Sequence, residues 1–152
     1  MKGAQAFVKN PGSEAIPAAR SGLDRCLVER RFRWLEFPVV RRVAAGFGVF
    51  LGIGAAGLAD FVLAVSETAA CAVCHGATGA VLRLWRDGPC VCCEVRGEAA
   101  PGMAQLAAQG DGVQAMRLSL LRQVCDYVWV EADSSGVTVR IAMTVTARPL
   151  PG

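Results

Sequence analysis

A cluster of cysteines with one histidine is the first candidate for chemistry in this chain. Residues 71–75 read C-x-x-C-H, a spacing that attaches haem and that also binds zinc. Cys90, Cys92 and Cys93 follow and could complete a tetrahedral zinc site. The combined spacing is not that of a standard zinc ribbon, and in a strand Cys90 and Cys92 face one way and Cys93 the other. We therefore expect buried thiols and no bound metal, with a zinc or redox module as an alternative.

A second candidate overlaps the first. Glu67, Cys71 and His75 are spaced four residues apart, so on a helix they share one face. A carboxylate on such a face can act as a general base. Alternatively Glu67 is structural and pairs with Arg83 or Arg86 of the following strand, and His75 caps the helix end.

Composition narrows the class of protein. Of the 152 residues, 53% are hydrophobic and 19% are charged, which is typical of a globular domain and not of a disordered chain. The net charge of +3, without blocks of basic residues, argues against nucleic-acid binding. An odd count of seven cysteines and the lack of a continuous apolar run in residues 1–20 predict a reducing, cytoplasmic location.

One apolar stretch raises the question of a membrane span. Residues 43–59 carry no charge, and their length is at the lower limit for a transmembrane helix. Five of these residues are glycine, which disfavours a stable isolated helix. We expect a buried helix followed by a loop, with a small membrane-associated protein as the alternative.

The periodicity of apolar residues predicts the elements that position these side chains. We expect a flexible tail over residues 1–30, one domain over 31–148 and a short tail over 149–152. The expected elements are an edge strand over 30–38, helices over 39–50 and 58–74, a hairpin over 80–88 and 89–97, a loop over 98–112, a helix over 113–126 and a hairpin over 127–132 and 137–145. This order predicts an α+β fold, a two-layer sandwich whose mostly antiparallel sheet of four or five strands is covered by helices on one face.

The run LAVSE at residues 63–67, followed at the right distance by His75, resembles a motif of the anti-sigma-factor serine/threonine kinases. These belong to the histidine-kinase-like (GHKL, or Bergerat-fold) ATPases, and their motif reads L-A-V-S-E-x-x-x-N-x-x-x-H. The ending LLRQVCDYVWVEADSSGVTVRIAM is also similar, and the resemblance covers roughly residues 32–147. It implies Mg-ATP as cofactor, Glu67 as general base and His75 in the pocket. It also implies a sigma factor or an anti-anti-sigma antagonist domain as partner, and it allows a homodimer.

Two positions of the implied nucleotide site depart from the family pattern. The asparagine that ligates Mg²⁺ is replaced by Cys71, whose soft sulfur is a poor ligand for a hard cation. The aspartate of V-x-D-x-G-x-G, which accepts a hydrogen bond from adenine, falls on Gly97. We expect that Cys71→Asn together with Gly97→Asp would raise ATP affinity roughly tenfold or more if both contacts re-form.

The phosphate-binding turn is altered as well. The glycines of the family's G-x-G-L turn fall on Ala115 and Arg117, while Gly110 and Gly112 lie upstream as substitutes. With three elements changed, the sequence predicts a regulatory protein that acts by protein–protein binding in transcription control and has a weakened ATP site. An active ATP-dependent serine/threonine kinase of the same family is the main alternative.

Overall fold

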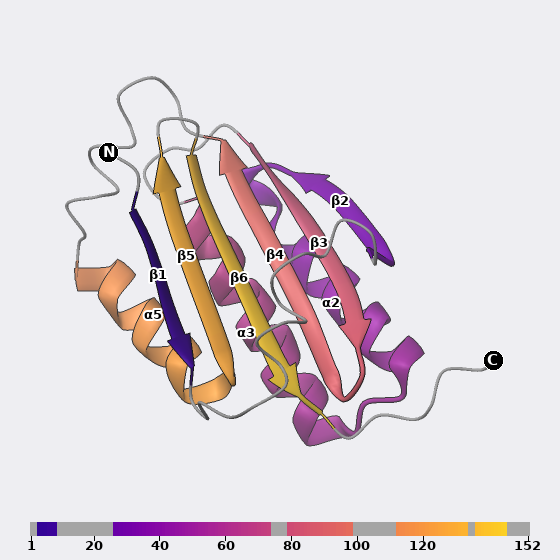
Figure 1. Cartoon of the computed structure of the whole chain (residues 1–152). Coiled ribbons are helices and arrows are strands. Elements are labelled where there is room, and N and C mark those ends of the chain that lie inside the picture. Colours follow the sequence, from indigo (N-terminus) through magenta and orange to yellow (C-terminus); the bar gives the residue numbers. More distant parts are fainter. Residues whose placement is uncertain (1–2, 9–25, 74–78, 99–111, 134–135, 146–152) are drawn as a thin grey trace.

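The computed structural model describes residues 3–8, 26–73, 79–98, 112–133 and 136–145. The elements, in chain order and with the labels of Figure 1, are β1 (Gly3–Val8), β2 (Val28–Phe32), η2 (Trp34–Glu36), α2 (Phe37–Leu51), α3 (Ala55–Ala72), β3 (Gly79–Asp87), β4 (Cys90–Glu98), α5 (Gly112–Val124), β5 (Tyr127–Asp133) and β6 (Gly136–Thr144).

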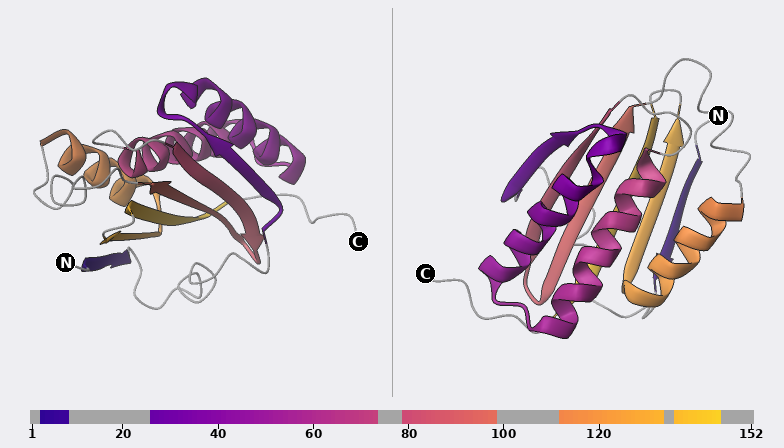
Figure 2. Two further views of the ribbon diagram at one scale, coloured as in Figure 1. Left: turned by 90° about the horizontal axis from the view of Figure 1, so that it is seen from above. Right: turned by 180° about the vertical axis from the view of Figure 1, so that it is seen from behind.

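The described elements form two layers. Six strands make one sheet in the order β1-β5-β6-β4-β3-β2, and every neighbouring pair is antiparallel. Helices α2, α3 and α5 lie together on one face of this sheet (Figure 2). The predicted α+β two-layer sandwich is thereby confirmed, although the sheet has six strands instead of four or five.

Both predicted hairpins are present. In the first, Asp87 pairs with Cys90, and Gly88 adopts a positive φ of 57°, a conformation that glycine reaches without steric cost. In the second, Asp133 pairs with Gly136. The two hairpins join through the β4–β6 pair, which no local sequence signal predicts.

The uncharged run over residues 43–59 is not one helix. It is broken at Gly52, which ends α2 with φ 74° and donates its amide to the carbonyl oxygens of Gly48 and Val49. Within the described part of the chain, α3 is the one helix long and apolar enough to cross a membrane. Its side chains Phe61 and Val65 are fully buried in the core between helices and sheet, so one face of α3 belongs to the core.

Two boundaries near the N-terminus were predicted wrongly. Residues Gly3–Val8 are not a flexible tail, because they form β1 and pair with β5 along its full length. The edge strand expected over 30–38 ends at Phe32, and Pro38 lies in the first turn of α2. Proline lacks an amide hydrogen and has a fixed φ, so it suits a first helical turn better than a strand.

Candidate functional site

Helix α3 brings Glu67 against α5. The Nε atom of Arg117 lies 3.3 Å from Oε2 of Glu67, and their side chains are 32% and 25% exposed. The sequence suggested Arg83 or Arg86 as the partner of Glu67. Arg83 instead binds Glu29 and Glu94, and Arg86 donates a hydrogen bond to the carbonyl oxygen of Gly88. Two residues of the predicted nucleotide site, the candidate base and a position of the phosphate-binding turn, therefore contact each other.

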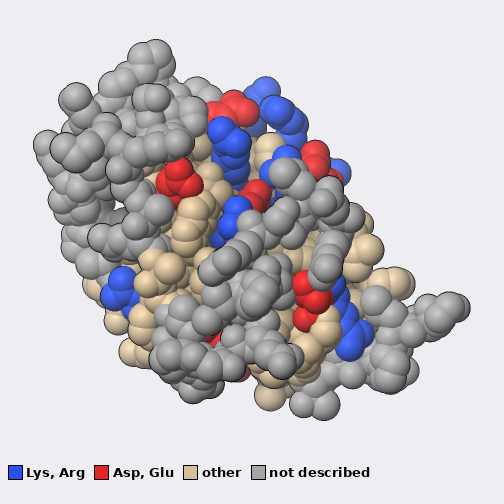
Figure 3. All heavy atoms as spheres, viewed as in Figure 1, with Lys and Arg blue, Asp and Glu red and all other residues tan. Residues whose placement is uncertain are grey.

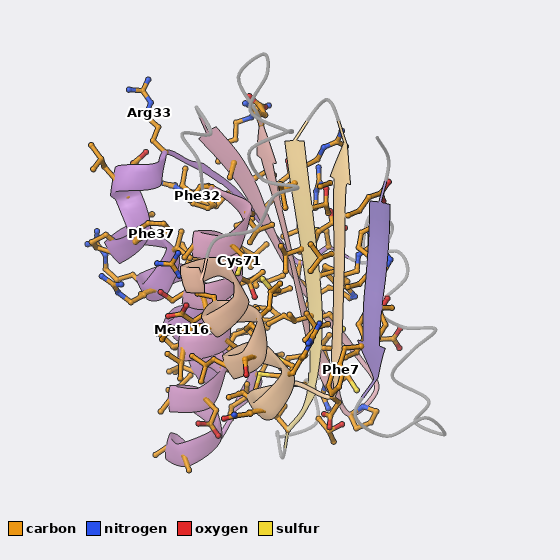
Figure 4. The ribbon with its side chains drawn as sticks, turned by 90° about the vertical axis from the view of Figure 1, so that its left-hand side faces the viewer. Phe7, Phe32, Arg33, Phe37, Cys71 and Met116 are labelled. Carbon is orange, nitrogen blue, oxygen red and sulfur yellow. The ribbon has the colours of Figure 1, made fainter. Side chains whose placement is uncertain are left out.

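Cys71 lies one turn further along α3, but in a different environment. Its side chain is fully buried in the core between helices and sheet, and Figure 4 shows its place on the helix. An asparagine here would carry its amide into an apolar layer, where a buried polar group costs free energy unless it finds a partner. His75, the third residue of this predicted face, lies outside the described residues.

Gly97 on β4 packs directly against the end of α3. A Cβ atom built on this glycine would collide with the carbonyl oxygen of Ala72 and would lie 2.8 Å from its carbonyl carbon. These are backbone atoms, so rotation of a side chain cannot relieve the clash. An aspartate at position 97 would therefore require the end of α3 or β4 to shift, which argues against the expectation that Gly97→Asp together with Cys71→Asn raises ATP affinity.

The predicted phosphate-binding positions lie at and within α5. Gly112 is its first residue, and Ala115 and Arg117 follow in the helix. The amide of Arg117 lies beyond the first four helical positions, so it is used in the helix's own hydrogen bonds. Gly110 falls in the part of the chain that the structure does not describe.

The face of the sheet opposite the helices carries a set of charges that the sequence analysis missed. Glu29, Arg83, Glu94 and Arg140 occupy one continuous row across β2, β3, β4 and β6. The row ends on β5, where the guanidinium of Arg140 lies 4.6 Å from the ring centroid of Trp129. Figure 3 shows acidic and basic side chains gathered on this face. The alternation along each strand predicts that these residues point away from the core. That they lie opposite one another in a single row depends on the register of the strands.

Glu94 is the centre of this row. It is only 8% exposed, and its Oε1 accepts a hydrogen bond of 3.1 Å from Arg83. Its Oε2 accepts two hydrogen bonds from Arg140, of 2.9 and 2.7 Å. Burial acts to lower the pKa of Arg83, but its hydrogen bonds to Glu29 and Glu94 outweigh burial and raise the pKa. The charges of this row thus pair with one another, and we interpret the row as a structural feature of the sheet.

The cysteines are divided between the two faces of the sheet. Cys90 and Cys92 pack with aromatic residues on the helix-free face, whereas Cys71, Cys93 and Cys125 lie in the core under the helices. The opposite orientations predicted for Cys90 and Cys93 are thus confirmed. Cys71 cannot share a metal site with Cys90 or Cys92, because the sheet separates them. Among the described residues, no group of three or more His, Cys, Asp or Glu side chains is placed to hold a metal ion.

These thiols are also held in their protonated form. Burial raises the pKa of Cys90 and raises the pKa of Cys92 to about 12. For Cys93 burial again dominates, and its pKa lies well above the usual value. Since the thiolate is the nucleophile, these raised pKa values disfavour nucleophilic attack by the three thiols at neutral pH.

A cavity of about 650 Å³ lies elsewhere, at the N-terminal end of α3. It is lined by the α2–α3 turn, by Asp60 and Val124, and by the end of β6. Glu67 is thirteen residues beyond Gly54, the residue that precedes α3, or about 20 Å along the helix axis. The cavity is therefore distinct from the predicted nucleotide cleft. The loop expected to cover that cleft, residues 98–112, lies almost entirely outside the described residues.

The geometry leaves two facts that bear on function. Glu67 is engaged by Arg117, and the space beside Gly97, which the resemblance aligns with an aspartate that binds adenine, is occupied by the backbone of Ala72. No protein-family model matches the chain, and no curated protein matches it either.

Proposed function

We propose that this protein is a cytoplasmic regulator of transcription that acts by binding a protein partner, in the manner of the anti-sigma-factor kinases, without efficient phosphoryl transfer. One observation carries the proposal. The general base and the adenine position of the implied ATP site are both taken up by intramolecular contacts, of Glu67 with Arg117 and of Gly97 with Ala72. Mg-ATP would be at most a weak ligand of such a site.

The outer surface of α2 supports the binding role. Arg41 and Arg42 are exposed and form no ion pair with any described residue. About two turns of helix further on, Val49 and Phe50 are 65% and 64% exposed. Surfaces that combine unpaired arginines with exposed large apolar side chains are typical of protein contacts. The arginines and apolar side chains of α2 suit a partner segment that carries both acidic and apolar side chains. A sigma factor or an antagonist domain could supply such a segment.

The test is a titration with purified partners. Sigma factors and antagonist-domain proteins of the source organism are each titrated into the full chain by calorimetry, with and without Mg-ATP. We expect one of them to bind with the same affinity in both conditions, and Arg41→Glu with Arg42→Glu to weaken that binding at least tenfold. Arg30→Glu with Arg33→Glu, the same change of charge at two exposed arginines outside α2, serves as the matched control.

A second measurement addresses the kinase alternative. Radiolabelled ATP is incubated with the chain and each candidate partner, and transfer of phosphate to a partner serine is followed. The proposal expects no transfer above the level of a Glu67→Gln variant. Micromolar binding of Mg-ATP, or transfer that depends on Glu67, would instead establish an active kinase.

A further inference from the structure

The described side chains of helix α5, from Met116 onward, are anchored unevenly. In its second half Leu121 is fully buried, and Leu118 and Val124 pack partly against the core. In its first half Met116 is 73% exposed, and Figure 4 shows it on the side of α5 turned away from the sheet. Among the described side chains of that half, Arg117 forms an ion pair with Glu67 of α3.

We propose that the Glu67–Arg117 pair is a clasp that docks the first turns of α5 onto α3 without the help of a nucleotide. The inference rests on the proposed function, and it states how the partner-binding form is kept in the absence of ATP. Because the pair is formed by a carboxylate on α3 and a guanidinium on α5, loss of either charge releases the same end of the helix. Because both side chains are about a quarter to a third exposed, salt screens their attraction.

The experiment is hydrogen exchange with mass spectrometry on the full chain, following the peptides that cover α5. The variants are Glu67→Gln, Arg117→Met and the two combined. Arg122→Met is the matched control, since it removes the same type of side chain from the other end of the same helix. Exchange of β4 and β6 peptides reports whether each variant keeps the fold.

Each single variant is expected to raise exchange in the first half of α5 about two- to fivefold, in line with a partly exposed pair. The double variant should do no more than a single one, since either change already breaks the pair. Sodium chloride at about 1 M should reproduce the effect in the parent chain, and Mg-ATP should change nothing.

Three results would overturn the clasp: exchange that is unaffected by the variants, effects of the single variants that add up, or slower exchange of α5 when Mg-ATP is added. None of these readouts involves the partner protein. A clasp that fails in this way is therefore distinguishable from failure of the proposed function, which partner titration decides.

Discussion

Glu94 and Arg140 face each other directly across β4 and β6, and two guanidinium nitrogens of Arg140 bind the same carboxylate oxygen at 2.9 and 2.7 Å. Arg83 binds the other oxygen from β3. A buried carboxylate shared between two arginines neutralises both only in part, and its removal leaves the row with one excess positive charge, since Arg83 keeps its contact with Glu29.

The first prediction is that Glu94→Gln destabilises the fold by about 3 kcal/mol, because breaking one partner of a buried ion pair leaves uncompensated charge. Urea unfolding measures it. Glu29→Gln removes a carboxylate from the same row, but its side chain is 58% exposed, so we expect a loss below about 1 kcal/mol. Equal effects of the two substitutions would contradict the burial argument.

The second prediction concerns Gly97. Gly97→Ala should destabilise the protein by several kcal/mol or prevent folding, since the new methyl group meets the backbone of Ala72. Gly46→Ala is the control, because a Cβ atom there meets nothing within 4 Å and alanine favours a helix interior by about 1 kcal/mol. Thermal unfolding compares the two. A stable Gly97→Ala protein would show that α3 is free to move away from β4.

The third prediction concerns thiol reactivity at pH 8. Cys26 is only half-buried and should react with iodoacetamide in the native protein. Cys92 and Cys93 should react only after unfolding, because burial raises the pKa of both thiols and shields them from the reagent. Peptide mapping by mass spectrometry identifies the modified positions. Rapid native modification of Cys92 would mean that the helix-free face opens readily.

The fourth prediction follows from the same raised pKa values. The pKa of a cysteine in an unfolded chain is about 8.5, whereas burial raises the pKa of Cys92 in the fold to about 12. Between these values the unfolded state loses the proton first, so stability is complete below about pH 8.5 and falls as pH rises towards 12. Urea midpoints at about pH 8 and pH 10.5 measure the loss. Cys92→Ala should reduce this slope, and an unchanged slope would exclude Cys92 as its source.

The fifth prediction concerns the attachment of β1. The guanidinium of Arg122 on α5 lies 5.5 Å from the ring centroid of Phe7, a contact of about 0.5–1 kcal/mol at a partly exposed site. Phe7→Leu should therefore speed hydrogen exchange in β1 two- to fivefold, while β4 is unaffected. The same change in an Arg122→Met background should have a smaller effect. Equal effects in both backgrounds would show that the ring is held by the sheet alone.

Patterns in the sequence were sufficient to predict the local elements and the class of fold. Periods of 3.6 and 2 located α2, α3, α5 and both hairpins, because burial of one face imposes those spacings on any chain. Alternation also placed Cys90 and Cys93 on opposite faces. The motif at residues 63–67 suggested a family and a site, and these stand as proposals.

The contacts of those residues, by contrast, depend on how distant segments of the chain pack together. The pairing of β1 with β5, of Glu67 with Arg117 and of Gly97 with Ala72 joins segments far apart in the sequence, and no local pattern encodes such contacts. The alignment of Glu94 between Arg83 and Arg140 depends on register across three strands. Register is set by the packing of whole faces, since a slip of one residue would exchange the buried and exposed sides.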